Sequence, residues 1–502
     1  KLIFSKDKIT ADLSALPNDK LTFIIRKTIS YKDFSFDSLF INKELSLNKK
    51  KNEIIPTIVS NKNIEYWQQA RHEDLSKNEQ SVFKMIDTLN TLPIFKEYTR
   101  NLEFLVDGHR KLGKIEIGPW YNWVSGNELE SVRFRFDVGT TDLFSKNLRL
   151  STYLAYGIKD RQAKQRFLLQ YRFPHLKGVS TELSYLNDLD NGRVRFSEED
   201  LTIDNIFSQA LRRPGIPQKF LGEEEFKVKF IKEWDNGLSN SITMARVDYE
   251  PYTPLPGKHT LVNGKYLQFT NSDFMYRIRY APGERKILTN RRPIRFKGTK
   301  PIYELRLSQG VQGLLGGNFS YSKIHASISQ KVRIPNFGQL TYNAYAGKIY
   351  GDSLPFMLLE LHPGNEVYIY NKNGFNLMNR FEYYSDSYAG FQIEHNFEKK
   401  LINLIPFLRR TNIRQFWTFK GVVGSMAASN RAFNRIELGP YQLRSLRDNF
   451  YLEYGTGFDN IFRFFRIDFV WRKSPPYPVN YSPSRMQPIQ NFGIFGSVRI
   501  QF

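Results

Sequence analysis

The stretch that decides the fold is Asn491–Phe502, which reads NFGIFGSVRIQF. Every second side chain in it is apolar or glycine, and the side chains between them, Phe495 excepted, are polar or glycine. Alternation with a period of two predicts a β-strand with one apolar and one polar face. The apolar face carries Phe492, Ile494, Val498, Ile500 and Phe502.

This stretch ends on an aromatic residue, although chain ends are commonly polar and frayed. Two interpretations fit. It is the closing strand of a membrane barrel, with Phe502 at the membrane interface, or it is a buried terminal strand of a soluble sheet. In the first case, Phe492, Ile494, Val498, Ile500 and Phe502 would form the C-terminal signal for barrel insertion.

The composition favours the barrel. Aromatic residues make up 15% of the 502 residues, and mean hydropathy is −0.47. No run of 18 apolar residues exists, so the sequence predicts no transmembrane helix, whereas a barrel needs only alternate residues to be apolar. The absence of cysteine excludes a disulfide framework and a thiolate metal site. Because the chain begins at Lys1 without a visible signal peptide, we expect a mature or trimmed product.

The formal net charge of +23 is compatible with a nucleic-acid binder. However, the cations are distributed along the expected strands. Arg133 and Arg135 alternate with Phe134 and Phe136, and the same pattern recurs around residues 277–280. Alternation places these arginines on one face of a sheet, here the barrel lumen, so we expect no nucleic-acid partner.

The sequence predicts three regions: a small strand-rich segment (1–60), a two-helix segment (61–110) and a transmembrane barrel (111–502). In the second, Ser76 and Glu79 form a capping box ahead of an apolar stripe that contains Val82, Met85, Ile86 and Leu89. Pro93 opens the next helix and Gly108 ends it. The fold class is therefore mainly β, an antiparallel barrel with a small N-terminal α+β region in the periplasm.

From Gly113 onward the apolar period changes from about 3.6 to 2. The pattern predicts about 16 strands. They lie near 113–124, 128–139, 147–158, 164–174, 178–187, 224–234, 238–249, 265–281, 300–310, 317–333, 336–350, 388–397, 411–424, 449–457, 462–472 and 491–502.

Loop lengths test this pattern, because bacterial outer-membrane barrels have short periplasmic turns and long outer loops. With both ends of the barrel in the periplasm, the predicted periplasmic connections are mostly short, and the longest connections, such as 351–387, lie outside. Connections 282–299 and 398–410 break the rule. The alternation favours an outer-membrane barrel with its N- and C-termini in the periplasm.

Three stretches resemble a large, poorly characterised outer-membrane family of Gram-negative bacteria. They are residues 83–119, with MIDTLNTLPIFKEY and FLVDGHRKLGKIEIGP, residues 379–397, with RFEYYSDSYAGFQIEHNF, and residues 451–471, YLEYGTGFDNIFRFFRIDFVW. Members of the family usually carry a carboxypeptidase-like regulatory domain ahead of the barrel. Residues 1–60 are too short to hold a complete one.

The C-terminal third is also similar in layout to the BamA-like assembly and translocation barrels. These have 16 strands, and an arginine of a Val-Arg-Gly-Phe motif in their long sixth outer loop reaches into the lumen. The sixth outer connection here is 351–387, which offers only Asn379-Arg380-Phe381. The resemblance makes Arg380 a candidate lumen-loop residue, and a solvated loop arginine is the alternative.

No motif for catalysis, cofactor or metal binding is found. The seven histidines do not pair at ligand spacing, and Gly313–Gly317 lacks the Lys and helix of a phosphate loop, which leaves it as an outer turn. We therefore expect no enzymatic activity, no cofactor and no metal. Residues 285–297, RKILTNRRPIRFK, hold six cations and no acid. They form either a docking strip for an acidic partner or lipid head groups, or a solvated loop.

Three functions remain open. The first is a non-enzymatic outer-membrane barrel that takes part in protein assembly or translocation, together with other outer-membrane proteins or lipoproteins and in contact with outer-membrane lipid. The second is a conduit or accessory barrel for solute uptake, and the third is a scaffold for other outer-membrane proteins. A loop 351–387 folded into the lumen would argue against the open pore of a conduit.

Overall fold

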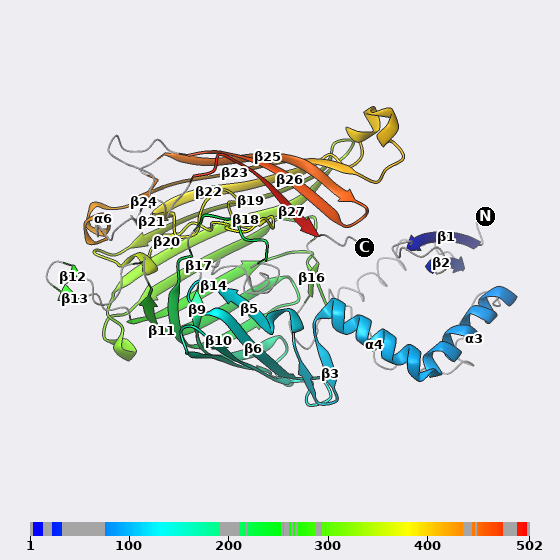
Figure 1. The fold of residues 1–502 in the computed structure, drawn as a ribbon, viewed down its shortest axis with the longest axis horizontal. Helices are drawn as coiled ribbons and strands as arrows, with labels where there is room; N and C mark the ends of the chain where they lie inside the picture. The colour runs from blue at the N-terminus through cyan, green and yellow to red at the C-terminus, as the bar shows by residue number, and fades with distance from the viewer. Residues whose placement is uncertain are drawn as a thin grey trace, which may run out of the picture. The chain divides into compact units, whose positions relative to one another are not determined.

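The computed structural model divides the chain into two compact units, Lys1–Leu102 and Glu103–Phe502 (Figure 1). It describes residues 4–13, 23–32, 76–190, 210–216, 218–252, 255, 261–262, 265–266, 270–287, 294–296, 298–434, 444–446, 449–474 and 489–498. Of the predicted C-terminal signal, Ile500 and Phe502 lie outside the described residues.

The N-terminal unit contains an antiparallel pair, β1 (Phe4–Leu13) and β2 (Phe23–Lys32), and the helix α3 (Lys77–Thr91). The capping box is confirmed, because the Ser76 N–H donates to Glu79 Oε2 at 2.8 Å and the Glu79 N–H donates to Ser76 Oγ at 3.3 Å. Helix α4 (Pro93–Asp107) starts at the predicted proline. It ends at Gly108, whose φ of 78° is the left-handed conformation that glycine tolerates.

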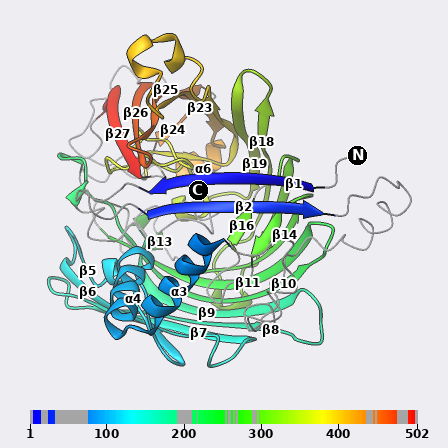
Figure 2. The same cartoon turned by 90° about the vertical axis from the view of Figure 1, so that its right-hand side faces the viewer.

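The second unit is an antiparallel sheet that curls into a barrel (Figure 2). Fifteen longer strands pair in sequence order, each with the next strand of the sheet. They are β6 (Ser131–Thr140), β7 (Leu148–Gly157), β8 (Ala163–Arg172), β9 (Val179–Asp190), β10 (Leu221–Glu233), β11 (Leu238–Pro251), β14 (Thr270–Tyr280), β17 (Ile302–Gly310), β18 (Tyr321–Ile334), β19 (Gly338–Tyr350), β22 (Ser387–Asn396), β23 (Arg414–Ser425), β25 (Phe450–Ile461), β26 (Phe465–Lys473) and β27 (Phe492–Val498). The predicted fold class, a mainly β barrel of about 16 strands, is confirmed.

The prediction of one continuous first strand at 113–124 is wrong. Three short strands, β3 (Arg110–Leu112), β4 (Ile115–Ile117) and β5 (Val124–Asn127), take its place. The chain turns back between β3 and β4 at Gly113, which has a φ of 69°. It then leaves the ladder at Gly118–Pro119, because Gly118 has a φ of 111° and proline has no N–H to donate.

The two faces of the barrel wall have the predicted chemistry. The side chains that alternate outward are apolar and exposed, among them Phe134, Phe136, Leu154, Phe167, Phe230, Ile242, Trp417, Phe419, Tyr454 and Phe492. Two of the predicted inward arginines show ion pairs: Arg133 with Asp188 at 2.7 Å, and Arg277 with Glu304 at 2.7 Å. An exposed apolar band around a barrel fits a location in the outer membrane. In the part of the chain that the structure describes, no helix is both long and apolar enough to cross a membrane.

The connections alternate in length, as predicted. Connections 173–178, 234–237, 335–337 and 462–464 are short and lie at one end of the barrel, because neighbouring strands are antiparallel. The strand ends joined by the long connections 191–220, 351–386, 426–449 and 474–491 are at the other end. The two exceptions remain, as 281–301 and 397–413.

The cationic segment 285–297 forms a short hairpin in its described part, of β15 (Arg285–Ile287) and β16 (Ile294–Phe296). Lys286 and Arg295 both contact Glu233, at 2.8 and 3.1 Å, and Arg295 also contacts Glu284 at 3.3 Å. These two cations are therefore neutralised within the chain, which weakens the prediction of an open docking strip.

Candidate functional site: a loop bound across the barrel lumen

The connection between β19 and β22, residues 351–386, is buried inside the barrel, and we call it the lumen loop. It contains the short helix η3 (Phe356–Leu358) and the strands β20 (Glu360–Leu361) and β21 (Tyr383–Ser385). Strand β21 is not part of the barrel sheet; it pairs with β20 and with β24 (Arg444–Ser445) in a small separate sheet. An outer loop of this length usually faces water, so its burial needs a physical cause.

The first cause is apolar packing on two sides of the lumen. Phe356, Phe381 and Tyr384 of the loop are buried with Val247 and Tyr249, which point inward from β11. A second cluster joins the loop residues Phe375, Met378 and Tyr383 to the inward-facing Val422 of β23 and Tyr451 of β25, together with Leu446. Since β11 and β23 are separated by five strands in the sheet order, the loop spans the lumen.

The second cause is a set of charged wall residues that bind the loop backbone. Lys420 of β23 donates from Nζ to the carbonyl oxygens of Asn371 at 2.8 Å, Lys372 at 3.1 Å and Gly374 at 2.7 Å. Glu453 of β25 accepts hydrogen bonds from the backbone N–H groups that follow, those of Asn376 and Leu377, both at 2.7 Å. Bonds from charged groups to a buried backbone are stronger than neutral ones and leave no loop dipole unsatisfied at these positions.

The third cause is an ion cluster around Glu382. Both Glu382 and Arg472 of β26 have fully buried side chains, and Arg472 Nη2 lies 2.6 Å from Glu382 Oε1. Arg444 contacts the same carboxylate at 2.7 Å, and the Asn379 N–H donates to it at 2.8 Å. Burial alone would raise the pKa of Glu382, but Arg472, Arg444 and the Asn379 N–H hold this pKa below its ordinary value. Arg472 also donates to the Leu377 carbonyl at 2.8 Å, so one wall arginine fixes two points of the loop.

Arg380, the predicted lumen-loop residue, lies inside the barrel and is 6% exposed. Its carbonyl accepts a hydrogen bond from Lys219 Nζ at 3.2 Å, and its Nε has no hydrogen-bond partner among the described residues. The ion pairs that bind this part of the loop to the wall come from Glu382. That Arg380 is the counterpart of the superfamily arginine stays a prediction.

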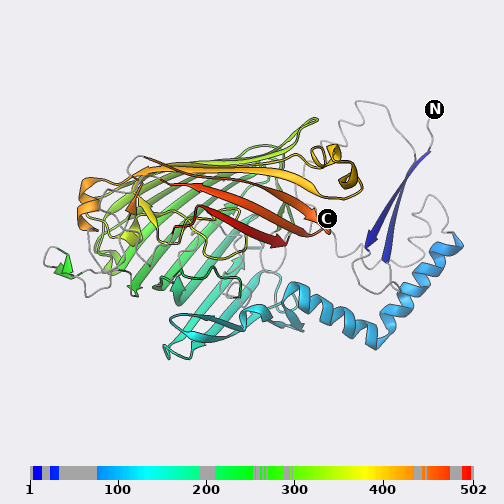
Figure 3. The same ribbon diagram turned by 45° about the horizontal axis from the view of Figure 1, so that its top comes forward.

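The lumen loop also binds the outermost C-terminal strand, β27, drawn in red beside β26 in Figure 3. The Tyr370 N–H donates to the Gly496 carbonyl, and the Gly496 N–H donates to the Tyr368 carbonyl, both at 2.9 Å. Gly496 lies opposite Ile467 of β26, but its N–H and C=O form hydrogen bonds with the loop. These groups therefore point to the edge of β27 that faces away from β26. The loop therefore occupies a strand edge as well as the lumen.

A second outer connection extends this contact. The Arg213 N–H donates to the Glu366 carbonyl at 2.9 Å, and the Tyr368 N–H donates to the Leu211 carbonyl at 2.7 Å. Residues 211–213, the loop and β27 are thus joined edge to edge by backbone hydrogen bonds. Backbone pairing of this kind satisfies polar groups that a free strand edge would leave open.

The three predicted C-terminal signal residues that the structure describes lie on the outer face of β27. Phe492, Ile494 and Val498 are exposed and point outward with the apolar band, while Phe495 points inward and is 1% exposed. Phe495, the one residue that breaks the alternation in the sequence, packs against Tyr370 and Leu377 of the lumen loop. This break in the alternation is the signal in the sequence for packing inside the barrel. A role for Phe492, Ile494 and Val498 in barrel insertion stays a prediction.

Elsewhere in the lumen, opposite charges are paired. Arg466 of β26 contacts Glu394 at 2.9 Å and Asp468 at 2.7 Å, which brings together two carboxylates that the sequence could not place. His362 of the loop contacts Ser385 Oγ through Nε2 at 2.9 Å, and burial lowers its pKa to about 3. Within the described ranges, no group of three or more His, Asp or Glu side chains is placed to hold a metal ion.

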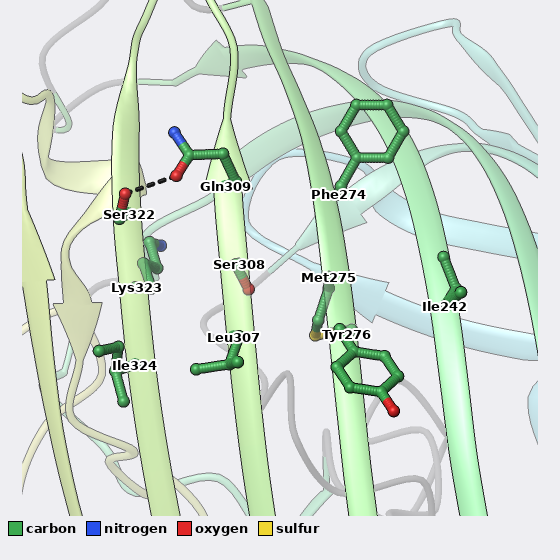
Figure 4. Close-up of a pocket in the computed structure, with 10 residues that line it drawn as sticks. All are labelled: Ile242, Phe274, Met275, Tyr276, Leu307, Ser308, Gln309, Ser322, Lys323 and Ile324. Atoms are coloured by element: carbon green, nitrogen blue, oxygen red, sulfur yellow. Dashed lines mark hydrogen bonds between the residues drawn. The ribbon is translucent and has the colours of Figure 1, made fainter.

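A depression of about 400 Å³ lies on the outer wall rather than in the lumen (Figure 4). Its apolar row crosses four strands, from Ile242 through Tyr276 and Leu307 to Ile324. Near it, Ser322 donates to Gln309. Because the depression is part of the lipid-facing band, we interpret it as membrane-contacting surface. We therefore place the candidate functional site at the lumen loop.

The fold and this site define a class: a barrel with an apolar outer face and a long outer loop bound across its lumen. Residues 110–424 match the C-terminal domain of the family of unknown function DUF5686. Because this match covers more than half of the chain, the protein belongs to that family. No curated protein matches the sequence.

Several solved structures are similar in fold. BamA from Haemophilus ducreyi lacking POTRA domains 1–3 shares 10% identity over 78% of this chain and 71% of that chain, with a TM-score of 0.43. CdiB from Escherichia coli shares 8% identity over 74% and 60%, with a TM-score of 0.41. Wzi, a carbohydrate-binding barrel involved in group 1 capsule assembly in Escherichia coli, shares 9% over 76% and 77%, with a TM-score of 0.30. These similarities concern the barrel fold alone.

Proposed function

We propose that this protein is a non-enzymatic outer-membrane barrel that takes part in the assembly or translocation of other outer-membrane proteins, within a larger complex. The observation that carries the proposal is the position of the lumen loop. It fills space that a solute conduit needs open, and it occupies the edge of a strand, where another chain could add by backbone pairing. The apolar outer band supplies the lipid-facing surface that such a protein requires.

The conduit is the second candidate, and its support is weaker than the sequence indicated. An arginine-rich lumen would favour anions only if its cations were available. Arg133, Arg277 and Arg466 each contact a carboxylate within 3 Å. The scaffold hypothesis, the periplasmic position of both termini and the regulatory domain ahead of the barrel remain expectations.

Two measurements on the purified wild-type protein test the proposal. In planar bilayers we expect little steady conductance, because the loop crosses the lumen. In gentle detergent, with chemical cross-linking beforehand, we expect other outer-membrane proteins or lipoproteins to co-purify. A matched pair of variants makes both measurements more specific: we expect Glu382→Gln to weaken loop binding, whereas Glu398→Gln alters a partly exposed residue in a connection at the opposite end of the barrel.

The outcomes separate the candidates. A large, steady wild-type conductance that Glu382→Gln leaves unchanged would favour the conduit and contradict the proposal. Low conductance that rises in Glu382→Gln but not in Glu398→Gln would support the closed lumen. Purification with lipid alone, under cross-linking that captures control complexes, would remove the support for an assembly role.

A further inference from the structure

Helix α4 carries an apolar stripe that the described structure leaves exposed. Ile94 is 85% exposed, Tyr98 61% and Leu105 60%, and Leu102 is exposed between them. At 100° per residue, these four side chains fall within roughly 80° of arc. The charged residues Lys96, Glu97, Arg100, Glu103 and Asp107 lie outside this arc.

The last turn of α4 is fixed to the start of the barrel. Trp120 donates from Nε1 to the Leu105 carbonyl at 3.3 Å, and the rings of Phe104 and Trp123 are 6.0 Å apart. Strand β3 begins at Arg110, three residues after the helix ends. Tryptophan concentrates where a barrel wall meets the membrane–water interface, so we expect the C-terminal turn of α4 to lie at the level of the lipid head groups.

The apolar surface continues from the helix to the first strands. Leu112 of β3, Ile115 of β4 and Val124 of β5 are exposed, like Leu105 on the last turn of α4. A helix at this level can place its stripe among the acyl chains while its backbone groups stay internally bonded. The charged side would then face water and the head groups.

We propose that α4 is an interfacial helix that lies in the membrane surface, with Ile94, Tyr98, Leu102 and Leu105 in contact with lipid. The partner is the lipid bilayer itself, at the rim where the chain enters the barrel. This inference rests on the proposed outer-membrane location and adds a second lipid contact outside the barrel wall.

The chain contains no cysteine, so single labels can be introduced without removing native thiols. The full-length protein, in nanodiscs of phosphatidylethanolamine and phosphatidylglycerol, receives a nitroxide at Ile94→Cys or Tyr98→Cys, and at Lys96→Cys or Arg100→Cys on the charged side. Phe419→Cys on the outer wall and Lys177→Cys in a short connection serve as lipid and water controls. Each variant is first checked for an unchanged far-UV strand signal.

We expect oxygen to relax the labels at positions 94 and 98 several-fold more, relative to a water-soluble nickel complex, than the labels at positions 96 and 100. Equal nickel access at all four positions would overturn the inference. Labels at 94 and 98 that neither reagent reaches would also overturn it, because protein would then cover the stripe. The control at position 419 distinguishes the outer-membrane location from the interfacial placement of α4. A water-exposed label at 419 would contradict the outer-membrane location itself. With a lipid-exposed label at 419, the labels on α4 test only the placement of that helix.

Discussion

Replacing Glu382 with Gln keeps the shape of the side chain and an oxygen for the Asn379 N–H, but removes the charge between Arg472 and Arg444. Both Glu382 and Arg472 are fully buried, so the arginine cannot recover its hydration while the loop stays in place. Removing one partner of a buried pair costs about 3–5 kcal/mol. We expect this cost to fall on loop binding, because the barrel ladders do not involve Glu382.

A loss of this size corresponds to an increase on the order of 100- to 5,000-fold in the unbound loop population. Hydrogen exchange followed by mass spectrometry measures it directly in peptides that cover residues 371–386. The N–H groups of Asn376, Leu377 and Asn379 donate to buried carboxylates, so their protection reports on binding. Glu398→Gln should leave this exchange unchanged, because Glu398 is partly exposed and lies 3.9 Å from the more exposed Arg333.

A double-mutant cycle distinguishes the charge effect from a general loss of packing. Arg472→Met should cost less loop-binding free energy in the Glu382→Gln background than in the wild type, because only in the wild type does it take the Arg472 partner from the buried Glu382 carboxylate. For residues in contact, we expect a coupling of about 0.5–3 kcal/mol. If Glu382→Gln exchanges like the wild type in residues 371–386, the ion cluster does not hold the loop and the reasoning from its burial is refuted.

Three further predictions use the same structure. Because the bound loop depresses the pKa of Glu382 below 4.5, its charge stabilises binding fully above that pH and loses this effect as the pH falls through the depressed value. The exchange difference between wild type and Glu382→Gln should therefore stay constant from about pH 8 to 5 and shrink only in stronger acid; a decline already near neutral pH would contradict this sign. Phe495→Ala should lower the free energy of unfolding by about 3–5 kcal/mol and speed hydrogen exchange in the loop. Phe492 is 46% exposed on the outer face, so Phe492→Ala should not have these effects. Equal effects of the two substitutions would show that the inward packing is unimportant. Gly338→Ala should lower the unfolding temperature on heated gels more than Gly283→Ala. Both glycines have positive φ, but a Cβ at 338 would lie 2.1 Å from the Asn396 carbonyl oxygen, whereas one at 283 meets nothing within 4 Å. Equal shifts in unfolding temperature would mean that the backbone of the turn at 338 moves to accommodate the Cβ.

The elements that follow local rules could be predicted from the sequence. The capping box at Ser76 and the stop at Gly108 depend on residues within one or two turns of each other, and both are confirmed. The strands followed from alternation, because the wall has lipid-like chemistry outside and polar chemistry inside. The prediction of one continuous first strand was wrong because side-chain periodicity contains no information on backbone conformation. The apolar pattern continues through Gly118 and Pro119, although the backbone leaves the ladder there.

The site could not be predicted in the same way, since it depends on contacts between distant residues. Glu382 and Arg472 are 90 residues apart, and Asn376 and Glu453 are 77 apart. Nothing in the local sequence distinguishes Lys420 and Glu453 from other polar residues on the inner faces of strands. A carboxylate at 382 between Phe381 and Tyr383, and Phe495 at an otherwise polar position of the last strand, are the two local irregularities that mark the site.

The residues of the lumen loop that fill the lumen contact the residues that cover the edge of β27, so we expect the two functions of the loop to be coupled. Tyr368 and Tyr370 bind the edge of β27 at Gly496, and only six residues later Asn376 and Leu377 bind Glu453 in the lumen. Tyr370 and Leu377 also meet in one apolar cluster with Val470 and Phe495. Because Tyr370 and Leu377 share this cluster, we expect a displacement of the backbone at Leu377 to remove packing from Tyr370 as well. The wall residues Glu453 and Arg472 therefore act on the β27 edge as well as on the lumen, although neither touches Gly496 in any described hydrogen bond.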